Sequence, residues 1–99
     1  MNYKGKHWLR KRQAILRRDE YLCQECKRYG KHTQASMVHH INAVDTHPFF
    51  TYTDDNLISL CNVCHDKMHD RNNNELTDIG LNWVKRVNNK LNCTPPPII

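Results

Sequence analysis

Two Cys-x-x-Cys pairs are the clearest chemical signal in this sequence of 99 residues. Cys23 and Cys26 form the first pair, and Cys61 and Cys64 form the second after an interval longer than in the commonest zinc ribbons. Thiolates at this spacing are typical ligands of structural zinc, and four of them close a tetrahedron without leaving a position for water or substrate. We therefore predict a structural zinc site formed by all four cysteines.

Disulfides are the alternative use of paired cysteines, and Cys93 would then be left over. The N-terminus is basic and aromatic with no apolar run behind it, unlike a secretory signal peptide. No apolar stretch is long enough to span a membrane. We therefore expect a cytoplasmic protein with no membrane partner, zinc in place of disulfides, and a free thiol at Cys93.

Four histidines form a second group of residues that can bind metal or move a proton. His65 and His69 stand four residues apart, a spacing at which helical histidine pairs hold catalytic metals. His39 and His40 are adjacent, so one could complete the metal site while the other, with an ordinary pKa near about 6.5, deprotonates water. Alternation along a strand would send these two side chains to opposite faces. Both can serve one site only if the strand is twisted or ends there.

Hydrophobic periodicity and turn signals predict the elements that must position these groups. The predicted elements are a helix over residues 6–18, short strands over 37–41 and 56–60, a helix over 62–71 and an amphipathic helix over 76–91. Trp8, Leu9, Ile15 and Leu16 form a partial apolar stripe on the first helix, and Ile79, Trp83, Val87 and Leu91 form one on the last. Gly80 weakens the last helix by about 1 kcal/mol.

The length of the chain allows one small domain, whose modest core would need a metal for stability. We place this domain at residues 1–92, with its core at about 20–71 and a flexible proline-rich tail at 93–99.

Positive charge is concentrated at the N-terminus. The net charge is +5, and no acidic residue precedes Asp19. A solvated helix face normally mixes both signs, so the block favours phosphate contacts by Arg12, Arg17 and Arg18. Charge alone leaves both DNA and RNA open.

A longer motif joins the cysteines and histidines. Val38-His39-His40-Ile41, then Asn56-Leu57-Ile58-Ser59-Leu60-Cys61, then Cys64-His65 resembles the motif of HNH endonucleases. The similarity extends upstream to Trp8, Arg12, Leu16, Arg17, Arg18, Asp19 and Tyr21-Leu22-Cys23, which are similar to small phage-type HNH proteins, and it covers about residues 6–70. This resemblance implies an α+β fold with a ββα-metal, treble-clef-like core and flanking N- and C-terminal helices.

The resemblance also implies roles for single residues. His40 would be the general base, and Asn56 would brace the loop and orient that base, although a plain loop-capping asparagine is the alternative. His65 would bind the catalytic metal together with His39, which stands where many members have aspartate. His69 resembles an extra metal-binding histidine of colicin-type nucleases, and its alternative is a surface residue near a helix end.

The implied activity is hydrolysis of DNA phosphodiester bonds with one catalytic divalent metal. An imidazole-rich site suits manganese, nickel or zinc better than magnesium, although the family often uses magnesium. We expect a monomeric nicking enzyme of low sequence specificity, with Lys67 and Arg71 near the flanking phosphates. Terminase subunits and the cytoplasm of a bacterial host follow from the phage-type resemblance. A catalytically inactive zinc-stabilised DNA-binding module and a toxin-like nuclease with an inhibitory partner remain alternatives.

Overall fold

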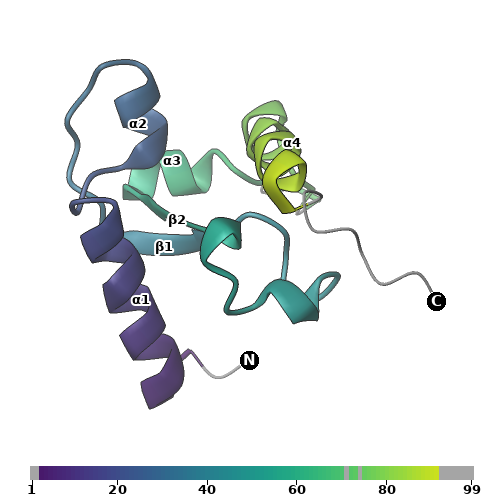
Figure 1. Ribbon diagram of the computed structural model, residues 1–99. Coiled ribbons are helices and arrows are strands. Elements are labelled where there is room, and N and C mark those ends of the chain that lie inside the picture. The colour runs from purple at the N-terminus through teal and green to yellow at the C-terminus, as the bar shows by residue number, and fades with distance from the viewer. Residues whose placement is uncertain (1–2, 71, 74, 92–99) are drawn as a thin grey trace.

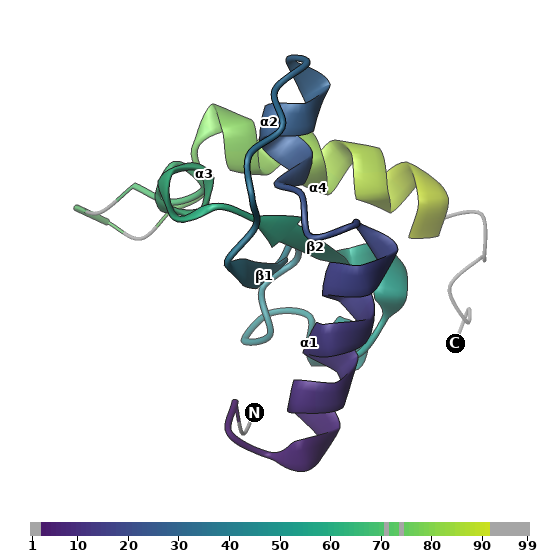
Figure 2. The ribbon, with the colours of Figure 1, turned by 90° about the vertical axis from the view of Figure 1, so that its left-hand side faces the viewer.

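The protein is described by a computed structural model at residues 3–70, 72–73 and 75–91, and its centre is a two-stranded antiparallel sheet. Strand β1 (Met37–His40) pairs with β2 (Leu57–Leu60), and His40 lies opposite Leu57. The helices are α1 (Lys6–Arg18), α2 (Gln24–Arg28), α3 (Asn62–Asp66) and α4 (Asp78–Leu91), with short 3-10 helices η1 (Pro48–Phe50) and η2 (Asp54–Asn56) between the strands. Helices α1 and α4 lie on opposite sides of the sheet (Figures 1 and 2). The predicted α+β class is confirmed.

Side-chain alternation along β2 divides the core into two parts. Leu57 packs with Trp8 and Ile15 of α1 on one face. Ile58 and Leu60 pack on the other face, against the cysteine segments and α4. The second part also contains Cys23, Ile41, Cys61, Cys64, Met68, Trp83 and Val87. Each face of the sheet is therefore covered by a different end of the chain.

A buried carboxylate fastens α1 to β2. Asp19 is only 9% exposed, and it accepts a hydrogen bond of 3.0 Å from the backbone N–H of Ser59. The guanidinium of Arg18 donates to the same carboxylate at 2.9 and 3.0 Å and to the carbonyl of Leu57 at 2.6 Å. The end of α1 is thereby held beside β2 by side-chain bonds as well as by packing.

The structure confirms the bounds predicted for the first helix but not the whole of its apolar stripe. Trp8, Ile15 and Leu16 are buried, whereas Leu9 is 49% exposed, so Leu9 does not belong to the buried side of the predicted stripe. Trp8 is buried beside Ile15 and Leu57, and Leu9, the next residue along the helix, is turned about 100° away from it. The N-terminal part of α1 projects beyond the sheet in both views (Figures 1 and 2).

The helix that follows β2 is shorter than predicted. It ends at Asp66 and not near residue 71, because the last turn tightens and the chain then reverses. The N–H of Met68 bonds to the carbonyl of His65 at 3.1 Å, and His69 pairs with Leu76 in an isolated β-bridge. Asparagines in the intervening segment favour this turn, since their side chains bond nearby backbone groups.

Helix α4 begins two residues later than predicted, after a side-chain cap. The hydroxyl of Thr77 accepts a hydrogen bond of 3.3 Å from the N–H of Gly80. Trp83 and Val87 of its predicted stripe are buried, and Ile79 packs against them from a half-buried position. Leu91 contributes no described side chain, and Cys93 and the predicted tail lie outside the described residues. Within the described part, no helix is long and apolar enough to cross a membrane.

The place of Gly80 gives a stability prediction. A Cβ at this position would lie 2.5 Å from the backbone oxygen of Met68, which cannot move without disturbing the turn before α4. Alanine would favour the helix by about 1 kcal/mol, but we expect Gly80→Ala to destabilise the protein by about 1–3 kcal/mol. Asn82→Ala, at an exposed site on the same helix, is the control and should be neutral or slightly stabilising. Thermal unfolding of both variants measures the difference, and a more stable Gly80→Ala protein would contradict the close contact.

Candidate active site and metal centre

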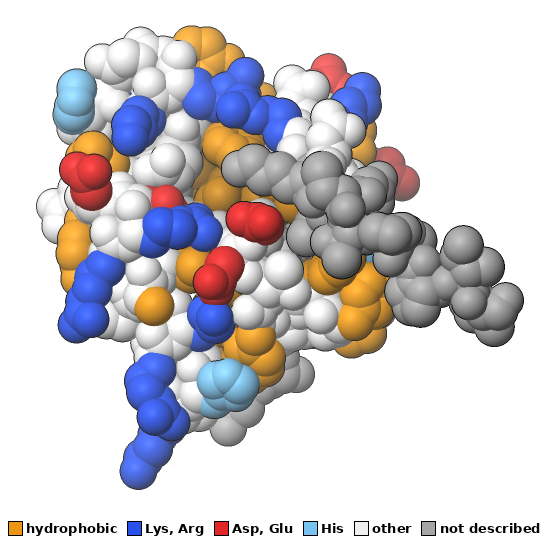
Figure 3. Space-filling model, viewed as in Figure 1, with side chains coloured by type: hydrophobic (Ala, Val, Ile, Leu, Met, Phe, Trp, Pro, Cys, Tyr) orange, Lys and Arg blue, Asp and Glu red, His pale blue; other side chains and the backbone are white. Residues whose placement is uncertain are grey.

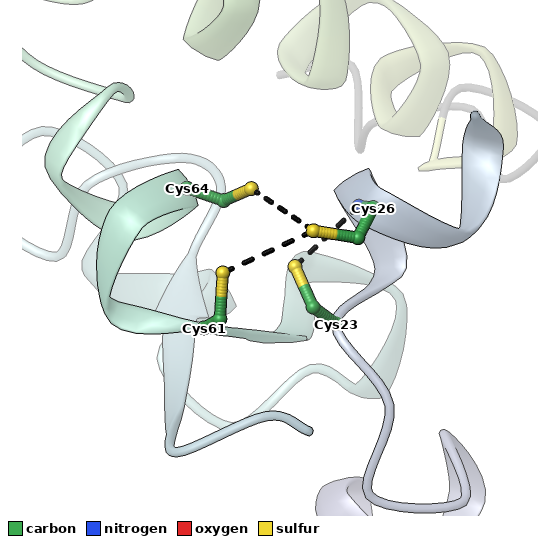
Figure 4. Close-up of side chains that lie close together, drawn as sticks. All are labelled: Cys23, Cys26, Cys61 and Cys64. Atoms are coloured by element: carbon green, nitrogen blue, oxygen red, sulfur yellow. Dashed lines mark hydrogen bonds between the residues drawn. The ribbon is translucent and has the colours of Figure 1, made fainter. Parts of the chain in front are cut away.

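Four sulfur atoms converge at one point between α2 and α3 (Figure 4). The Sγ atoms of Cys23, Cys26, Cys61 and Cys64 all lie within 4.8 Å of one another. Cys26 lies 4.0 Å from Cys61 and 3.6 Å from Cys64, sulfur to sulfur. A tetrahedral zinc ion with Zn–S bonds of about 2.3 Å requires sulfurs about 3.8 Å apart. The spacing and the donor type both fit a structural metal ion held by the two predicted pairs.

Short helices place these cysteines. Cys23 directly precedes α2, and its Sγ accepts a hydrogen bond of 3.5 Å from the N–H of Cys26. Cys61 directly precedes α3, without a side-chain cap bond, and Cys64 lies in the first turn of that helix. Burial raises the pKa of the Cys23 and Cys64 thiols above the ordinary value. A bound cation would reverse that effect by favouring the thiolates.

The second candidate site is built from histidines of β1, of α3 and of the turn that follows α3. Its centre is the imidazole of His39, which is 5% exposed. The ring centroids of His65 and His69 lie 5.3 and 5.8 Å from it. The three predicted ligands are thus brought together, although His69 lies beyond the end of α3. Among the described residues, only the cysteines bring three or more ligand atoms as close as 4.8 Å.

The protonation of His39 suits metal binding. Burial, together with the neighbouring imidazoles of His65 and His69, lowers its pKa to about 3. Burial also lowers the pKa of His65, although Asp66 acts in the opposite direction. A neutral imidazole carries the lone pair that a metal ion needs. Histidines in this environment are therefore available as ligands near neutral pH.

His40 occupies the other face of β1. Its ring stacks on Trp8 of α1 with centroids 4.9 Å apart, and its Nε2 lies 3.0 Å from the carbonyl oxygen of Thr51. A carbonyl can only accept, so Nε2 carries the proton and donates, which leaves Nδ1 as the basic nitrogen of the neutral ring. Burial lowers the pKa of His40, and the Thr51 carbonyl acts against that shift.

Both faces of β1 open into one cleft. Strand alternation separates the two histidines, as expected. Among the described residues β1 has no neighbour on its outer edge, and the strand ends at His40. An open cleft of about 390 Å³ runs beside this edge. It is lined by Tyr3, Met37, Val38, His39, His40, Ala43, Val44, Asp45, His65 and His69. A single ligand in this cleft can therefore meet His40 and the three-histidine group together.

Asn56 acts on the loop and not on His40 directly. It is fully buried, and its Oδ1 accepts from both the backbone N–H and the Nδ2 of Asn42, at 2.8 and 3.0 Å. Its Nδ2 donates to the carbonyls of Asn42 and Phe50 at 3.1 and 3.3 Å. These bonds close the loop that carries Thr51. Asn56 thus positions the acceptor of the His40 bond.

Two members of this network were not predicted. Asn42 is 4% exposed, and its Nδ2 also donates to Oδ1 of Asn88 in α4 at 3.1 Å. Asn42 follows the histidine strand as a polar residue in an apolar context, which is the one sequence signal for it. No local pattern connects it to Asn88, because that contact spans almost half of the chain.

The basic residues predicted to bind phosphate have different surroundings. Arg18 is engaged with Asp19, Leu57 and the carbonyl of Asp54, and Arg12 donates to the carbonyl of Ser36 at 3.0 Å. Arg17 is exposed. Lys67 lines a pocket beside the cysteines and not the histidine cleft. Arg71 lies outside the described residues.

Comparisons with known proteins point to one family. The family model for HNH endonuclease matches residues 23–71, which contain all four clustered cysteines and all four site histidines. A solved structure with 41% sequence identity and a TM-score of 0.63 is the HNH endonuclease of the deep-sea thermophilic bacteriophage GVE2 with a manganese ion. The match covers 65% of this chain and 70% of that one. No curated protein matches the chain.

The sequence identity, the shared fold and the match over the cysteine and histidine segment agree with one another. The chain belongs to the HNH endonuclease family.

Proposed function

We propose that the protein is a metal-dependent DNA endonuclease in which His40 is the general base. The observation that carries this proposal is the Nε2 bond of His40 to the Thr51 carbonyl. It holds the ring in the tautomer whose Nδ1 can take a proton, and the ring lines the same cleft as the histidine group. The attacking water would give its proton to Nδ1 and its oxygen to phosphorus.

Other residues in and around the cleft would have the remaining roles. His39, His65 and His69 would hold a divalent metal, whose chemistry when bound is to stabilise negative charge on the phosphate and the departing oxygen. Trp8 supports one face of the His40 ring, and Asn56 fixes the loop that carries its hydrogen-bond acceptor. The neutral state of His39 supports a ligand role and argues against proton transfer by that residue.

DNA is the substrate that the family and the charge support together. Only two acidic residues, Asp19 and Glu20, lie before the first cysteine, and Asp19 is already paired with Arg18. Contacts to the phosphate backbone carry no sequence information. We therefore propose nicking with low intrinsic sequence specificity. Association with terminase subunits, a monomeric state and a cytoplasmic location stay predictions from the resemblance to phage-type proteins.

The role of His40 can be tested with supercoiled plasmid. His40→Ala should lower the nicking rate in manganese by about 10²- to 10⁴-fold, the range expected for loss of a general base. His32→Ala changes an exposed histidine away from the cleft and should cut at the wild-type rate. Circular dichroism and bound zinc would show that both variants are folded. Equal cutting by His40→Ala would exclude this residue as the base.

Zinc at the cysteine cluster can be tested without any DNA. The purified chain should contain one zinc ion, and Cys64→Ser should lose it and unfold, since the free energy of metal binding is part of the free energy of folding. Cys93→Ser removes the cysteine outside the two pairs and should retain the metal. Metal analysis and thermal unfolding supply the two readouts. A stable Cys64→Ser protein without zinc would contradict a structural role for the metal.

Arg17 and Arg18 are adjacent, but we expect Arg17 to contribute to phosphate binding and Arg18 to contribute to stability. Arg17 has no side-chain bond or ion pair within the part of the chain that the structure describes, so Arg17→Ala should weaken DNA binding and reduce the salt slope by about 1. Arg18→Ala should cost about 1–3 kcal/mol of stability, because the buried carboxylate of Asp19 loses two donors. Binding titrations at several salt concentrations and chemical unfolding measure the two effects. A reversed pattern would contradict the assignment.

A further inference from the structure

Three exposed aromatic side chains lie in or next to the cleft that holds His40. Tyr3 lines that cleft, and Phe49 and Tyr52 line a neighbouring pocket that shares Val44 with it. Phe49 is 70% exposed, Tyr3 56% and Tyr52 36%. The ring of Tyr3 lies edge-on to His40, with centroids 6.3 Å apart, and edge-on to Trp8 at 5.8 Å. Large aromatic rings left in water are unfavourable for a chain with so small a core. Because these rings lie near a candidate catalytic histidine, we considered which ligand they could bind.

Contacts within the protein hold these rings in place. Tyr52 stacks on His7 of α1 with centroids 3.9 Å apart and an interplanar angle of 12°. Phe49 packs edge-on against Phe50 at 4.5 Å. The carbonyl of Phe50 accepts from Asn56, and Thr51 next to it binds His40. The aromatic segment is thus tied to the same hydrogen bonds that orient the proposed base.

Positive charge borders the aromatic surface. Lys6 and Arg10 are exposed on the same N-terminal half of α1 as His7. In Figure 3 basic side chains follow α1 down the visible face, and hydrophobic side chains reach the surface beside its lower end. Cationic side chains that track a phosphate backbone, interleaved with rings that stack on bases, are the means by which proteins bind unpaired nucleotides.

We propose that Tyr3, His7, Phe49 and Tyr52 form a stacking surface for unpaired bases next to the phosphate that is cut. The preferred substrate is then DNA with unpaired or distorted bases and not an intact duplex. A fully paired duplex must first be unstacked to reach these rings, whereas DNA that is already unpaired avoids that cost. This inference rests on the proposed nuclease function and names its substrate class.

Binding to two labelled DNAs tests the proposal. One is a short paired duplex, and the other is the same duplex with a few mismatched pairs in the middle. Titrations without added divalent cation measure binding alone, and a denaturing gel confirms that the DNA stays intact. Wild-type protein should bind the mismatched DNA about tenfold more tightly, and Phe49→Ser and Tyr52→Ala should each lose most of that preference, because the contribution of stacking on one base is of this order.

Tyr29→Ser is the matched control, because Tyr29 is also 70% exposed but lies beside the cysteine cluster. It should keep the wild-type preference. Equal wild-type affinity for the two DNAs would overturn the stacking surface. So would a preference for mismatched DNA that both Phe49→Ser and Tyr52→Ala retain, or one that Tyr29→Ser also loses. These results would leave the proposed function intact, since the His40 assay tests cutting separately. Failure to bind either DNA would overturn both.

Discussion

The convergence of four cysteine sulfurs is the constraint on which the candidate active site depends. Helices α2 and α3 have five residues each, and each strand has four. Elements of that length are not stable alone. The cysteines join the two helices at one point, and β2 runs directly into Cys61. Because β1 pairs with β2, the same constraint fixes where the adjacent histidines lie.

The two adjacent histidines of β1 face different helices. Alternation along β1 turns His39 toward α3, where His65 and His69 surround it, and turns His40 toward α1, where Trp8 supports its ring. The environments differ accordingly, since His39 is buried among imidazoles whereas His40 keeps a carbonyl partner. An edge strand that ends at its second histidine lets both serve one cleft.

The resemblance to HNH endonucleases implied the α+β class, and local patterns in the sequence were sufficient for the cysteine cluster and the bounds of α1. These features depend on residue spacing, which the sequence displays directly. The end of α3 was mispredicted, because the reversal at His69 depends on backbone pairing with Leu76. The engagement of Arg18 by Asp19 and Leu57, and the burial of Asn42, depend on contacts between distant segments. A count of nearby charges could not distinguish Arg18 from Arg17.

The bond between Asn42 and Asn88 bears on how this nuclease could be moved into another protein. The family-matched segment ends at residue 71, yet Asn88 and the buried Trp83 and Val87 come from α4 beyond it. On the other side, Trp8 supplies the surface against which His40 rests. A fusion protein that contained only the matched segment would have the clustered cysteines and histidines without the helices that pack against them. The transferable unit for protein engineering therefore runs from the start of α1 through α4.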